Sequence, residues 1–286
     1  MNYVLISTGI IPEYIKYTIN TILSVDKDAH IIIGTDKKTK LKNVEIVYLN
    51  DLISAQTQNI DNLTTYDKTS NENHGAMNGS LLRIFYLRDL QKKLGFDQFI
   101  HFDNDVLIYK PYQEIQESFD INKFNITPSS QRRLIFGFSF VPKFQALNQL
   151  CESLQKKIIE GHKNDWPENS KTLPNEEDLL GMLYQEQKDL FNLLPNLPYE
   201  SGIVFDPISY GQYIDGSKSY PRKIYSRRSI NFNETVGIEL YSKRIKLKFK
   251  NNNPIVLWDG KKYELSNLHI KSKRFHKFLP SSYKIY

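Results

Sequence analysis

The chain has 286 residues, with 38 Lys and Arg against 32 Asp and Glu, so its formal net charge is +6 at pH 7. A hydrophobic fraction of 40% excludes a wholly disordered chain, and this length can bury a core without a disulfide or metal staple.

The single cysteine, Cys151, excludes a framework of intramolecular disulfides and favours a reducing compartment, which predicts a cytoplasmic location. Cys151 lies among leucines at helical spacing, so we expect it to be an inert core residue. The positive charge favours an anionic partner, namely nucleic acid, a phosphorylated small molecule or an anionic lipid surface.

Neither a signal peptide nor a membrane span is expected from the apolar segments. No basic segment precedes the first apolar run, which ends within a few residues, so Tyr3–Ser7 is interpreted as a β-strand. The longest nearly apolar run, Leu134–Val141, is too short to cross a bilayer. The sequence therefore predicts a soluble protein, with contact at the inner face of a membrane left open.

Short apolar strands alternate with a helical pattern at the start of the chain. After Tyr3–Ser7, apolar residues recur at helical spacing over Ile15–Leu23, and Pro12 suits the first position of that helix. His30–Gly34 and Val44–Leu49 are the second and third predicted strands. This order predicts an α/β fold with a mostly parallel sheet flanked by helices.

The next elements lead to the most informative motif. The polar stretch Gln56–Asn73 is interpreted as a mobile loop because it is rich in Asn, Thr and Asp. A long helix is predicted over Met77–Leu94, with Gly95 as its end. The predicted strand Gln98–Phe102 then runs directly into Asp103-Asn104-Asp105.

The second half of the chain is less regular. Leu134–Val141 is an apolar run, and a helix is predicted over Phe144–Glu160 that Gly161 closes. A short helix begins near Asn175, and basic strands near Ile245–Phe249 lead into a basic tail. No repeat, low-complexity block or linker interrupts the chain, so a single domain is the simplest organisation.

Asp103 and Asp105 interrupt an apolar part of the sequence, directly after a predicted strand. A buried carboxylate needs water, a donor or a cation, and oxygen ligands at this spacing suit Mg²⁺ or Mn²⁺. Ligands of α/β sheets bind at the carboxyl ends of the strands, which favours a metal site. The same residues could instead cap a strand-ending turn, and the spacing alone leaves both interpretations open.

The order of these features resembles the GT-A glycosyltransferases. Thr8-Gly9 follows the first predicted strand, Asp36 follows the second, and an Arg-bearing helix precedes the strand that ends in Asp-x-Asp. Leu81–Leu87 is similar to the helix before that motif in nucleotide-sugar transferases of the glycogenin and lipopolysaccharide galactosyltransferase group. Three further segments resemble parts of such enzymes or of bacterial and viral polysaccharide-type transferases: Asn175–Leu180, Phe205–Tyr213 and Asn267–Lys273.

The resemblance implies that Asp103 and Asp105 hold Mn²⁺ or Mg²⁺ on the diphosphate of a nucleotide-sugar donor, with His269 as a further ligand. It also implies a set of donor-binding residues: Thr8, Gly9, Asp36, Arg83, Asn104, Lys271 and Lys273. Asp36 would accept a hydrogen bond from the base or ribose, and Arg83 would reach the sugar or phosphate. Lys271 and Lys273, two apart on a predicted strand, would face the phosphates together. The alternatives are a core histidine at 269, a helix-surface charge at Arg83 and an exposed strand face for the lysines.

The acidic run Glu176-Glu177-Asp178 has a structural and a catalytic interpretation. Asn175 is a good helix cap, and acids in the first turn complement the helix dipole. In the catalytic interpretation, Glu177 or Asp178 lies near the acceptor hydroxyl. It would act as the general base of an inverting enzyme or orient the donor sugar in a retaining one.

These observations predict one GT-A domain over 1–286, a Rossmann-like sheet with a basic C-terminal segment that packs back over the donor site. Within it, 1–110 would bind the nucleotide sugar, 111–235 the acceptor, and 236–286 would complete the metal and diphosphate site. The predicted function is a metal-dependent hexosyltransferase that moves a sugar from a nucleoside-diphosphate donor, expected to be a UDP-sugar. The expected acceptor is a glycan or lipid-linked oligosaccharide of polysaccharide or glycoconjugate synthesis, and no nucleic acid is expected as a partner.

Two other function classes stay open on the sequence alone. In a non-catalytic carbohydrate- or nucleic-acid-binding protein, the basic tail Lys243–Lys277 would bind the ligand through the interleaved rings of Tyr241, Phe249 and Phe275. A nucleotidyltransferase would also pair acids on a metal. It usually brings a Gly-rich phosphate loop, which this sequence lacks.

Overall fold

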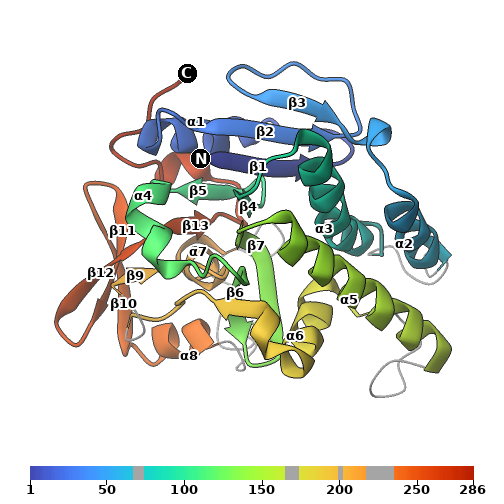
Figure 1. Cartoon of the computed structure of the whole chain (residues 1–286). Helices are drawn as coiled ribbons and strands as arrows, with labels where there is room; N and C mark the ends of the chain where they lie inside the picture. The colour runs from blue at the N-terminus through green and yellow to red at the C-terminus, as the bar shows by residue number, and fades with distance from the viewer. Residues whose placement is uncertain (67–73, 165–173, 199–201, 217–234) are drawn as a thin grey trace.

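A seven-stranded sheet runs through the centre of the computed structural model, which describes residues 1–66, 74–164, 174–198, 202–216 and 235–286 (Figure 1). Its strand order is β3-β2-β1-β4-β7-β6-β8. Pairs β3–β2, β2–β1, β1–β4 and β6–β8 are parallel, while β4–β7 and β7–β6 are antiparallel. The predicted α/β fold with a mostly parallel sheet is therefore confirmed. The strands are β1 (Asn2–Ser7), β2 (His30–Thr35), β3 (Glu45–Tyr48), β4 (Phe99–Phe102), β6 (Phe124–Ser130), β7 (Arg133–Val141) and β8 (Phe191–Leu193).

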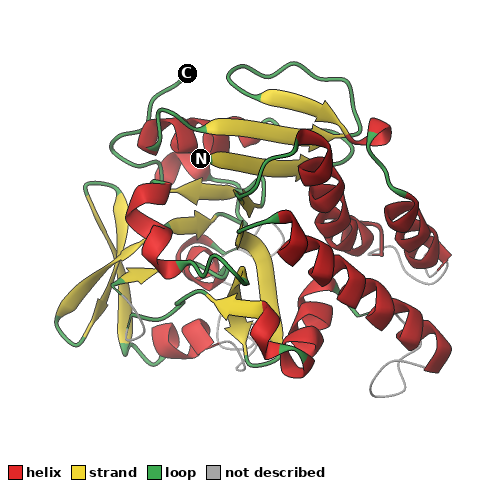
Figure 2. Ribbon diagram, viewed as in Figure 1, coloured by secondary structure: helices red, strands yellow, loops and turns green. Residues whose placement is uncertain are grey.

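Helices cover both faces of this sheet (Figure 2). Helices α3 (His74–Leu94), α5 (Phe144–Asn164) and α6 (Glu176–Glu186) share one apolar cluster with the sheet, and α1 (Ile15–Val25) packs in a second cluster. Because both faces are covered, β1 and β2 are continuous apolar runs rather than alternating ones. Helix α6 lies very close to the β6–β7 turn: a Cβ on Gly181 would come within 1.8 Å of the carbonyl oxygen of Arg132. This close approach holds the middle of α6 beside the sheet.

The C-terminal part of the chain returns to the first half. After β4, the short strand β5 (Val106–Ile108) pairs antiparallel with β13 (Asn267–His269). A second sheet has the order β10-β11-β12-β9 and packs with a third apolar cluster. The prediction that the C-terminal segment packs back is confirmed. The elements of this part are β9 (Ile203–Val204), α7 (Ser209–Asp215), α8 (Thr235–Tyr241), β10 (Ile245–Lys250), β11 (Asn253–Trp258) and β12 (Lys261–Leu265).

The prediction of a loop over Gln56–Asn73 is wrong for its first part, because α2 spans Ala55–Tyr66. The helix is too polar to show an apolar periodicity, and polar contacts anchor it instead. The hydroxyl of Thr57 donates to the carboxylate of Asp89 on α3 at 2.6 Å, and Ile60 is fully buried. Residues 67–73 of the predicted loop lie outside the described residues.

Two helix boundaries also differ from the sequence prediction. Helix α1 begins at Ile15 rather than at Pro12, whose carbonyl accepts the N–H of Ile15 at 3.0 Å. Helix α5 continues through Gly161 to Asn164, because a glycine permits a helix end without requiring one. Gly95 does end α3 as predicted, with φ +71° and its N–H bonded to the carbonyl of Gln91.

Cys151 is the buried core residue that the sequence predicts. Its side chain is fully buried on α5, and burial raises the pKa of the thiol well above its ordinary value. The thiol is therefore protonated and unreactive at neutral pH.

Across the described ranges, none of the helices is long and apolar enough to cross a membrane.

His101 on β4 is a fully buried imidazole in the middle of the sheet. Its Nδ1 lies 2.8 Å from the carbonyl oxygen of Val4, which can only accept, so Nδ1 carries the proton. Its Nε2 has no hydrogen-bond partner among the described residues. Burial and the nearby Arg83 cation lower the pKa of His101 well below its ordinary value, so the native ring stays neutral.

We predict that His101 makes the fold sensitive to acid. The unfolded chain binds a proton at this ring below about pH 6.5, whereas the native chain does not, so the free energy of unfolding falls as pH decreases. The contribution is about 1.4 kcal/mol per pH unit once the unfolded ring is charged. Urea unfolding between pH 7 and pH 5 should show a shallower pH dependence for His101→Gln than for the unmodified chain. Equal slopes would contradict a neutral His101 in the native state.

Candidate metal and donor site

The turn that follows β4 carries Asp103 and Asp105 at the carboxyl edge of the central sheet. The N–H of Asp103 donates to the carbonyl of Gly137 on β7 at 3.1 Å, and the carbonyl of Asp103 accepts the N–H of Val106 at 3.1 Å. The turn is thus tied to the neighbouring strand on one side and to β5 on the other. Both carboxylates leave the sheet where its parallel strands end, which is the usual position of ligand sites in α/β folds.

Pairing of β5 with β13 brings His269 beside these acids. Val106 lies opposite His269 in this antiparallel pair, and the carbonyl of Asp105 accepts the N–H of Ile270 at 2.8 Å. The Nε2 atom of His269 lies 2.9 Å from Oδ1 of Asp105 and 3.7 Å from Oδ2 of Asp103. Ligand atoms of all three residues lie within 4.8 Å of one another. The sequence predicted this set, and the structure brings it together.

The protonation states of this cluster suit a divalent cation. Burial lowers the pKa of His269 although Asp105 opposes the effect, so the imidazole is neutral at pH 7. Burial alone would raise the pKa of Asp105, but His269 and Lys273 hold it well below its ordinary value. A neutral imidazole, the ionised carboxylate of Asp105 and the carboxyl group of Asp103 are together a donor set for Mn²⁺ or Mg²⁺.

The lack of a side chain at Gly137 on β7 makes room for the cluster of Asp103, Asp105 and His269. A Cβ at this position would lie 3.2 Å from Oδ2 of Asp103 and 3.2 Å from Nδ1 of His269. Any side chain at this position would therefore require Asp103 and His269 to move by a few tenths of an ångström. No pattern in the sequence marks this glycine, because its role depends on a strand packed across the sheet.

Asp206 fixes the backbone around His269. One carboxylate oxygen accepts the N–H of Ile208 at 2.8 Å and of Tyr210 at 2.9 Å. The other oxygen accepts the N–H of Gly211 at 3.1 Å and of His269 at 2.9 Å. Burial raises the pKa of Asp206 to about 6, although these backbone bonds oppose the effect. Sequence reasoning missed Asp206, and only the resemblance of its segment to other transferases marked that region.

Arg83 on α3 joins two acids instead of extending into solvent. Its guanidinium contacts the carboxylate of Asp103 and donates to Glu176 at 2.6 Å. The same group lies 5.2 Å above the ring of Phe136. Glu176, which is 5% exposed, is the first acid of the run Glu176-Glu177-Asp178. Arg83 connects Glu176 to Asp103, although the sequence pattern pointed to the other two acids of the run.

Glu177 and Asp178, the other two acids of that run, lie in the first turn of α6. Asn175 caps this helix as predicted, because its side chain accepts the N–H of Asp178 at 2.9 Å. Arg133 pairs with Glu177 at 2.9 Å and with Asp178 at 2.8 Å. Burial raises the pKa of Glu177 although Arg133 opposes the effect, and a raised pKa is typical of a carboxylate that accepts a proton.

A cleft of about 440 Å³ opens beside the acids. Thr8, Arg83 and Asn104 line it together with Tyr14 and other residues of the β1–α1 connection. The amide nitrogen of Asn104 donates to the carbonyl of Ile6 at 3.3 Å, and its buried oxygen has no partner in the described part of the chain. That oxygen can accept a hydrogen bond from a ligand in the cleft.

Gly9 and Asp36 shape the loop at the mouth of this cleft. Gly9 has φ +77°, a conformation that glycine adopts without strain, and its N–H donates to Asp36 at 2.7 Å. The two residues that follow β1 and β2 are therefore in direct contact. Asp36 retains a second carboxylate oxygen for a further partner, since Lys37 approaches it only at 3.7 Å.

The expectation that Lys271 and Lys273 share one face of a strand is wrong, because β13 ends at His269. The segment after β13 forms a turn instead, which Asp215 stabilises. Its carboxylate accepts hydrogen bonds from the hydroxyl of Ser272 at 2.5 Å and from Nε of Arg274 at 2.7 Å. Lys273 adopts φ +61° in this turn, and its ammonium contacts Asp105 and lies 5.0 Å above the ring of Tyr14. Of the two lysines, Lys273 is the one that contacts the cluster, whereas Lys271 acts on His269 only through its charge.

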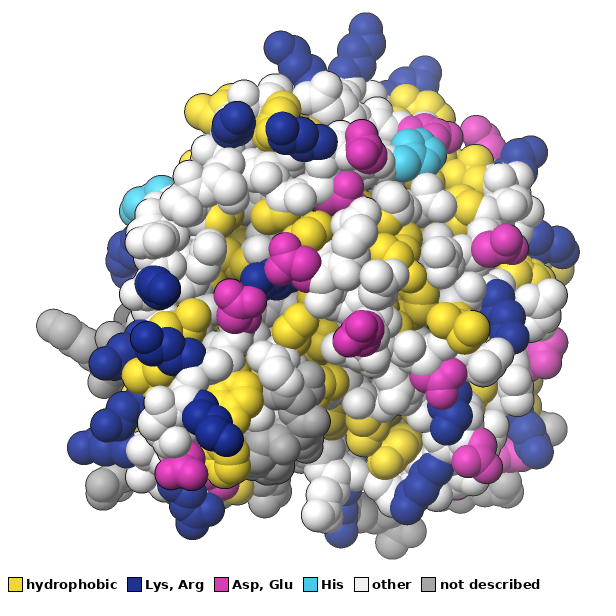
Figure 3. Space-filling model, turned by 60° about the vertical axis from the view of Figure 1, so that its left-hand side comes forward, with side chains coloured by type: hydrophobic (Ala, Val, Ile, Leu, Met, Phe, Trp, Pro, Cys, Tyr) yellow, Lys and Arg dark blue, Asp and Glu magenta, His cyan; other side chains and the backbone are white. Residues whose placement is uncertain are grey.

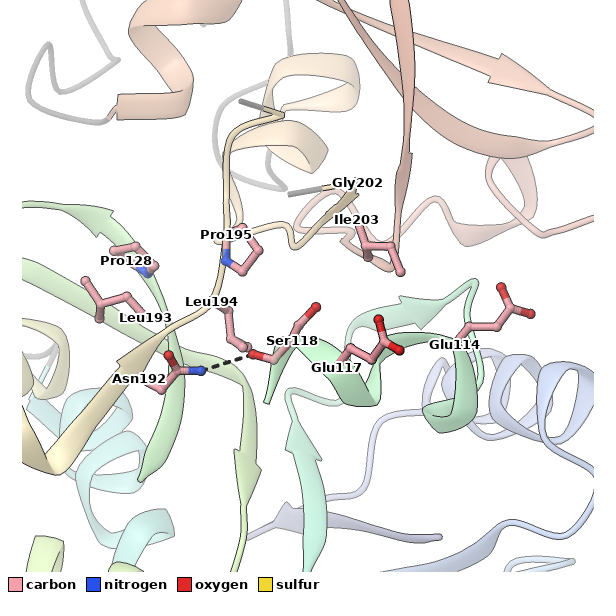
Figure 4. A pocket seen from close by; sticks show the side chains of 10 residues that line it. All are labelled: Glu114, Glu117, Ser118, Pro128, Asn192, Leu193, Leu194, Pro195, Gly202 and Ile203. Carbon is pink, nitrogen blue, oxygen red and sulfur yellow. Dashed lines mark hydrogen bonds between the residues drawn. The ribbon is translucent and has the colours of Figure 1, made fainter. Parts of the chain in front are cut away.

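A larger cavity of about 650 Å³ lies elsewhere, among α4 (Tyr112–Ile115), β8 and β9 (Figure 4). Glu114 and Glu117 are the charged residues that line it, and Asn192 donates to the carbonyl of Ser118 at 3.0 Å. Its described lining has no cationic side chain, so this cavity offers a phosphate no cation to bind. The smaller cleft beside Asp103 is the one that suits an anionic donor.

No protein-family model matches the chain, and no curated protein sequence matches it. Its fold is similar to that of solved glycosyltransferase structures. One is galactosyltransferase LgtC in complex with donor and acceptor sugar analogues, with a TM-score of 0.48 at 12% identity over 76% of this chain and 79% of that chain. Another is mouse xyloside xylosyltransferase 1 without ligand, with a TM-score of 0.47 at 9% identity over 68% of this chain and 86% of that chain. A third is GlyE of Streptococcus pneumoniae TIGR4, with a TM-score of 0.39 at 12% identity over 68% of this chain and 44% of that chain. These likenesses concern the course of the backbone.

We predict that Arg83 is the main electrostatic support of the cluster. Arg83→Met leaves Asp103 and Glu176 close together without their cation, which should lower the free energy of unfolding by about 3 kcal/mol. The matched control is Lys156→Met, because the Lys156–Glu160 ion pair at 3.9 Å is largely exposed and should cost less than about 1 kcal/mol. Urea unfolding of both variants measures the difference. Equal losses would contradict the role given to Arg83.

Proposed function

We propose that this chain is a metal-dependent glycosyltransferase that uses a nucleoside-diphosphate sugar, specifically a UDP-sugar, as donor. The observation that carries the proposal is the cluster of Asp103, Asp105 and His269 at the carboxyl edge of the sheet. It lies beside a cleft that Arg83 and Asn104 line. The order of sequence motifs, which resembles the GT-A enzymes, supplies the reaction class.

The three residues of the cluster would hold the divalent ion. Two carboxylates and one imidazole favour Mn²⁺ over Mg²⁺, since Mg²⁺ prefers oxygen ligands alone. When bound there, such an ion would supply positive charge to neutralise a departing nucleoside diphosphate. The ammonium of Lys273 contacts Asp105 in the free protein and is within reach of the same phosphates.

The loop of Thr8 and Gly9 would bind the nucleoside part of the donor. A glycine with positive φ permits a close approach of the ligand to the backbone. Asp36 accepts the N–H of Gly9 with one oxygen, so its other oxygen is the candidate for a ribose or base contact. The unpartnered oxygen of Asn104 would accept a hydrogen bond from the sugar or phosphate end, and Arg83 and Lys271 would add positive charge there.

Glu177 or Asp178 would act on the acceptor side. Both carboxylates pair with Arg133, which holds them at the start of α6. One of them would receive the proton of the acceptor hydroxyl or orient the donor sugar. We propose a glycan or a lipid-linked oligosaccharide as acceptor, bound largely by residues 111–235, with residues 236–286 completing the diphosphate site.

The nucleic-acid alternative loses its main support in the folded chain. Phe275, one of the rings expected to stack on bases, is 1% exposed and stacks on Tyr14 and Tyr17 with centroids 5.3 and 5.4 Å away. Phe249 packs toward Phe278 at 5.8 Å. Tyr241 and Phe249 are 38% and 39% exposed, so the basic tail presents two partly exposed rings rather than the row of three that this alternative requires.

We predict that nucleotide-sugar binding requires the metal cluster. A UDP-sugar at about 100 times its Kd should raise the melting temperature by about 5 °C in Mn²⁺ and by much less in chelator. Asp103→Asn and Asp105→Asn should abolish the Mn²⁺-dependent part of this shift and lower sugar transfer at least about a hundredfold. Thermal-shift measurements with a panel of nucleotide sugars test the binding, and product formation tests the transfer.

Asp259→Asn is the matched control, because Asp259 is an exposed acid in the turn between β11 and β12. It should keep both the shift and the transfer. Full activity of the two cluster variants in excess chelator would exclude a metal-dependent reaction. The absence of a shift from every nucleotide sugar would contradict the proposed donor.

A further inference from the structure

The second sheet has one face that packs inward and one that faces outward. The pairing of β10 with β11 sets Lys246 opposite Leu257 and Lys248 opposite Ile255. The pairing of β11 with β12 sets Leu257 opposite Lys262. Since successive strand residues alternate between faces, these side chains share one face. We call this the lysine face, and it consists of Lys246, Lys248, Lys250, Ile255, Leu257 and Lys262.

The four lysines of this face are exposed, whereas Ile255 and Leu257 between them are partly buried. No ion pair joins these lysines to an acid within the described ranges, and the one acid on the same face, Glu264, pairs with Lys110 at 2.5 Å. In Figure 3, Lys and Arg side chains gather at the lower left with apolar side chains among them. The face is therefore a surface of unpaired positive charge around a small apolar strip.

The aromatic side chains of these strands belong to the opposite face. Phe249, Trp258 and Tyr263 alternate with the lysine-face residues, and Trp258 and Tyr263 pack against the third apolar cluster. Proteins that hold single-stranded nucleic acid need exposed rings on which bases stack, and this face has none. A flat basic surface with aliphatic side chains at its centre suits an anionic lipid headgroup layer better.

We propose that the lysine face binds the anionic surface of a phospholipid bilayer. The lysines lie over the headgroups, and Ile255 and Leu257 contact the boundary with the acyl chains. The site of Asp103 and His269 lies on other elements, so this binding does not depend on the proposed transfer reaction. If the acceptor is lipid-linked, binding of the lysine face would keep the enzyme at the membrane that contains the acceptor.

Vesicle sedimentation of the full chain tests this binding. Vesicles of equal parts phosphatidylglycerol and phosphatidylcholine should bind the unmodified chain, and vesicles of phosphatidylcholine alone should not. Each lysine near such a surface contributes about a fivefold gain in affinity. The variant with Lys246, Lys248, Lys250 and Lys262 all changed to Gln should therefore bind at least about a hundredfold more weakly.

The matched control removes the same number of charges from helices on the other side of the molecule. Lys92, Lys93, Lys156 and Lys188 are exposed on or beside α3, α5 and α6, and changing all four to Gln should reduce vesicle affinity only a fewfold. The double variant Ile255→Ser and Leu257→Ser keeps every charge and should still weaken binding. Circular dichroism of all variants checks that each is folded.

Three results would overturn the proposal. The first is equal loss of vesicle binding in the two four-lysine variants. The second is tight binding of an oligouridine RNA together with weak binding of the anionic vesicles. The third is unchanged vesicle binding with increased self-association when the lysines of β10 are removed, because β10 is an edge strand and lysines there also prevent edge pairing.

Discussion

The antiparallel pairing of β5 with β13 is the interaction on which the candidate site depends. Asp103 and Asp105 come from the first half of the chain and His269 from its last segment, and this pairing is what makes them neighbours. Asp206 strengthens the arrangement from a third segment by accepting the N–H of His269. Bringing these distant segments together costs chain entropy, which the apolar cluster beneath the second sheet offsets. The second sheet therefore stabilises the site although it contributes no ligand.

Charge balance explains why so many acids can be buried at one edge of the sheet. Asp103 and Glu176 share Arg83, and Asp105 contacts both His269 and Lys273. Each buried acid thus has a cation or a polar neighbour, as the desolvation cost of an ionised carboxylate requires. His269 and Lys273 also hold the pKa of Asp105 well below its ordinary value, so this candidate ligand is ionised at neutral pH.

The sequence predicted the elements whose patterns are local. The strands β1, β2 and β4, the helix α3 with its end at Gly95, and the cap at Asn175 all depend on residues close together in the chain. Helix α2 was missed because Asp89 on another helix anchors it, and polar contacts of this kind leave no periodicity in the sequence. The strand predicted for Lys271 and Lys273 failed for a similar reason, since Asp215 bends that segment from a distance.

The same distinction separates the predicted ligands from the supporting residues. Asp103 and Asp105 are marked by their position after an apolar strand, and His269 by the order of motifs alone. Gly137, Glu176 and Asp206 act through spatial contacts that no spacing in the sequence records. Resemblance to known transferases could select the candidate ligands, whereas the residues that hold them in place required the folded chain.

The most direct measurement of the central claim is anomalous X-ray diffraction from crystals grown with Mn²⁺ and a nucleoside diphosphate. The account predicts one strong anomalous peak bonded to carboxylate oxygens of Asp103 and Asp105 and to a ring nitrogen of His269, with the diphosphate on the same ion. A crystal that contains the diphosphate but has no such peak, or that has Mn²⁺ bound only at other residues, would contradict it.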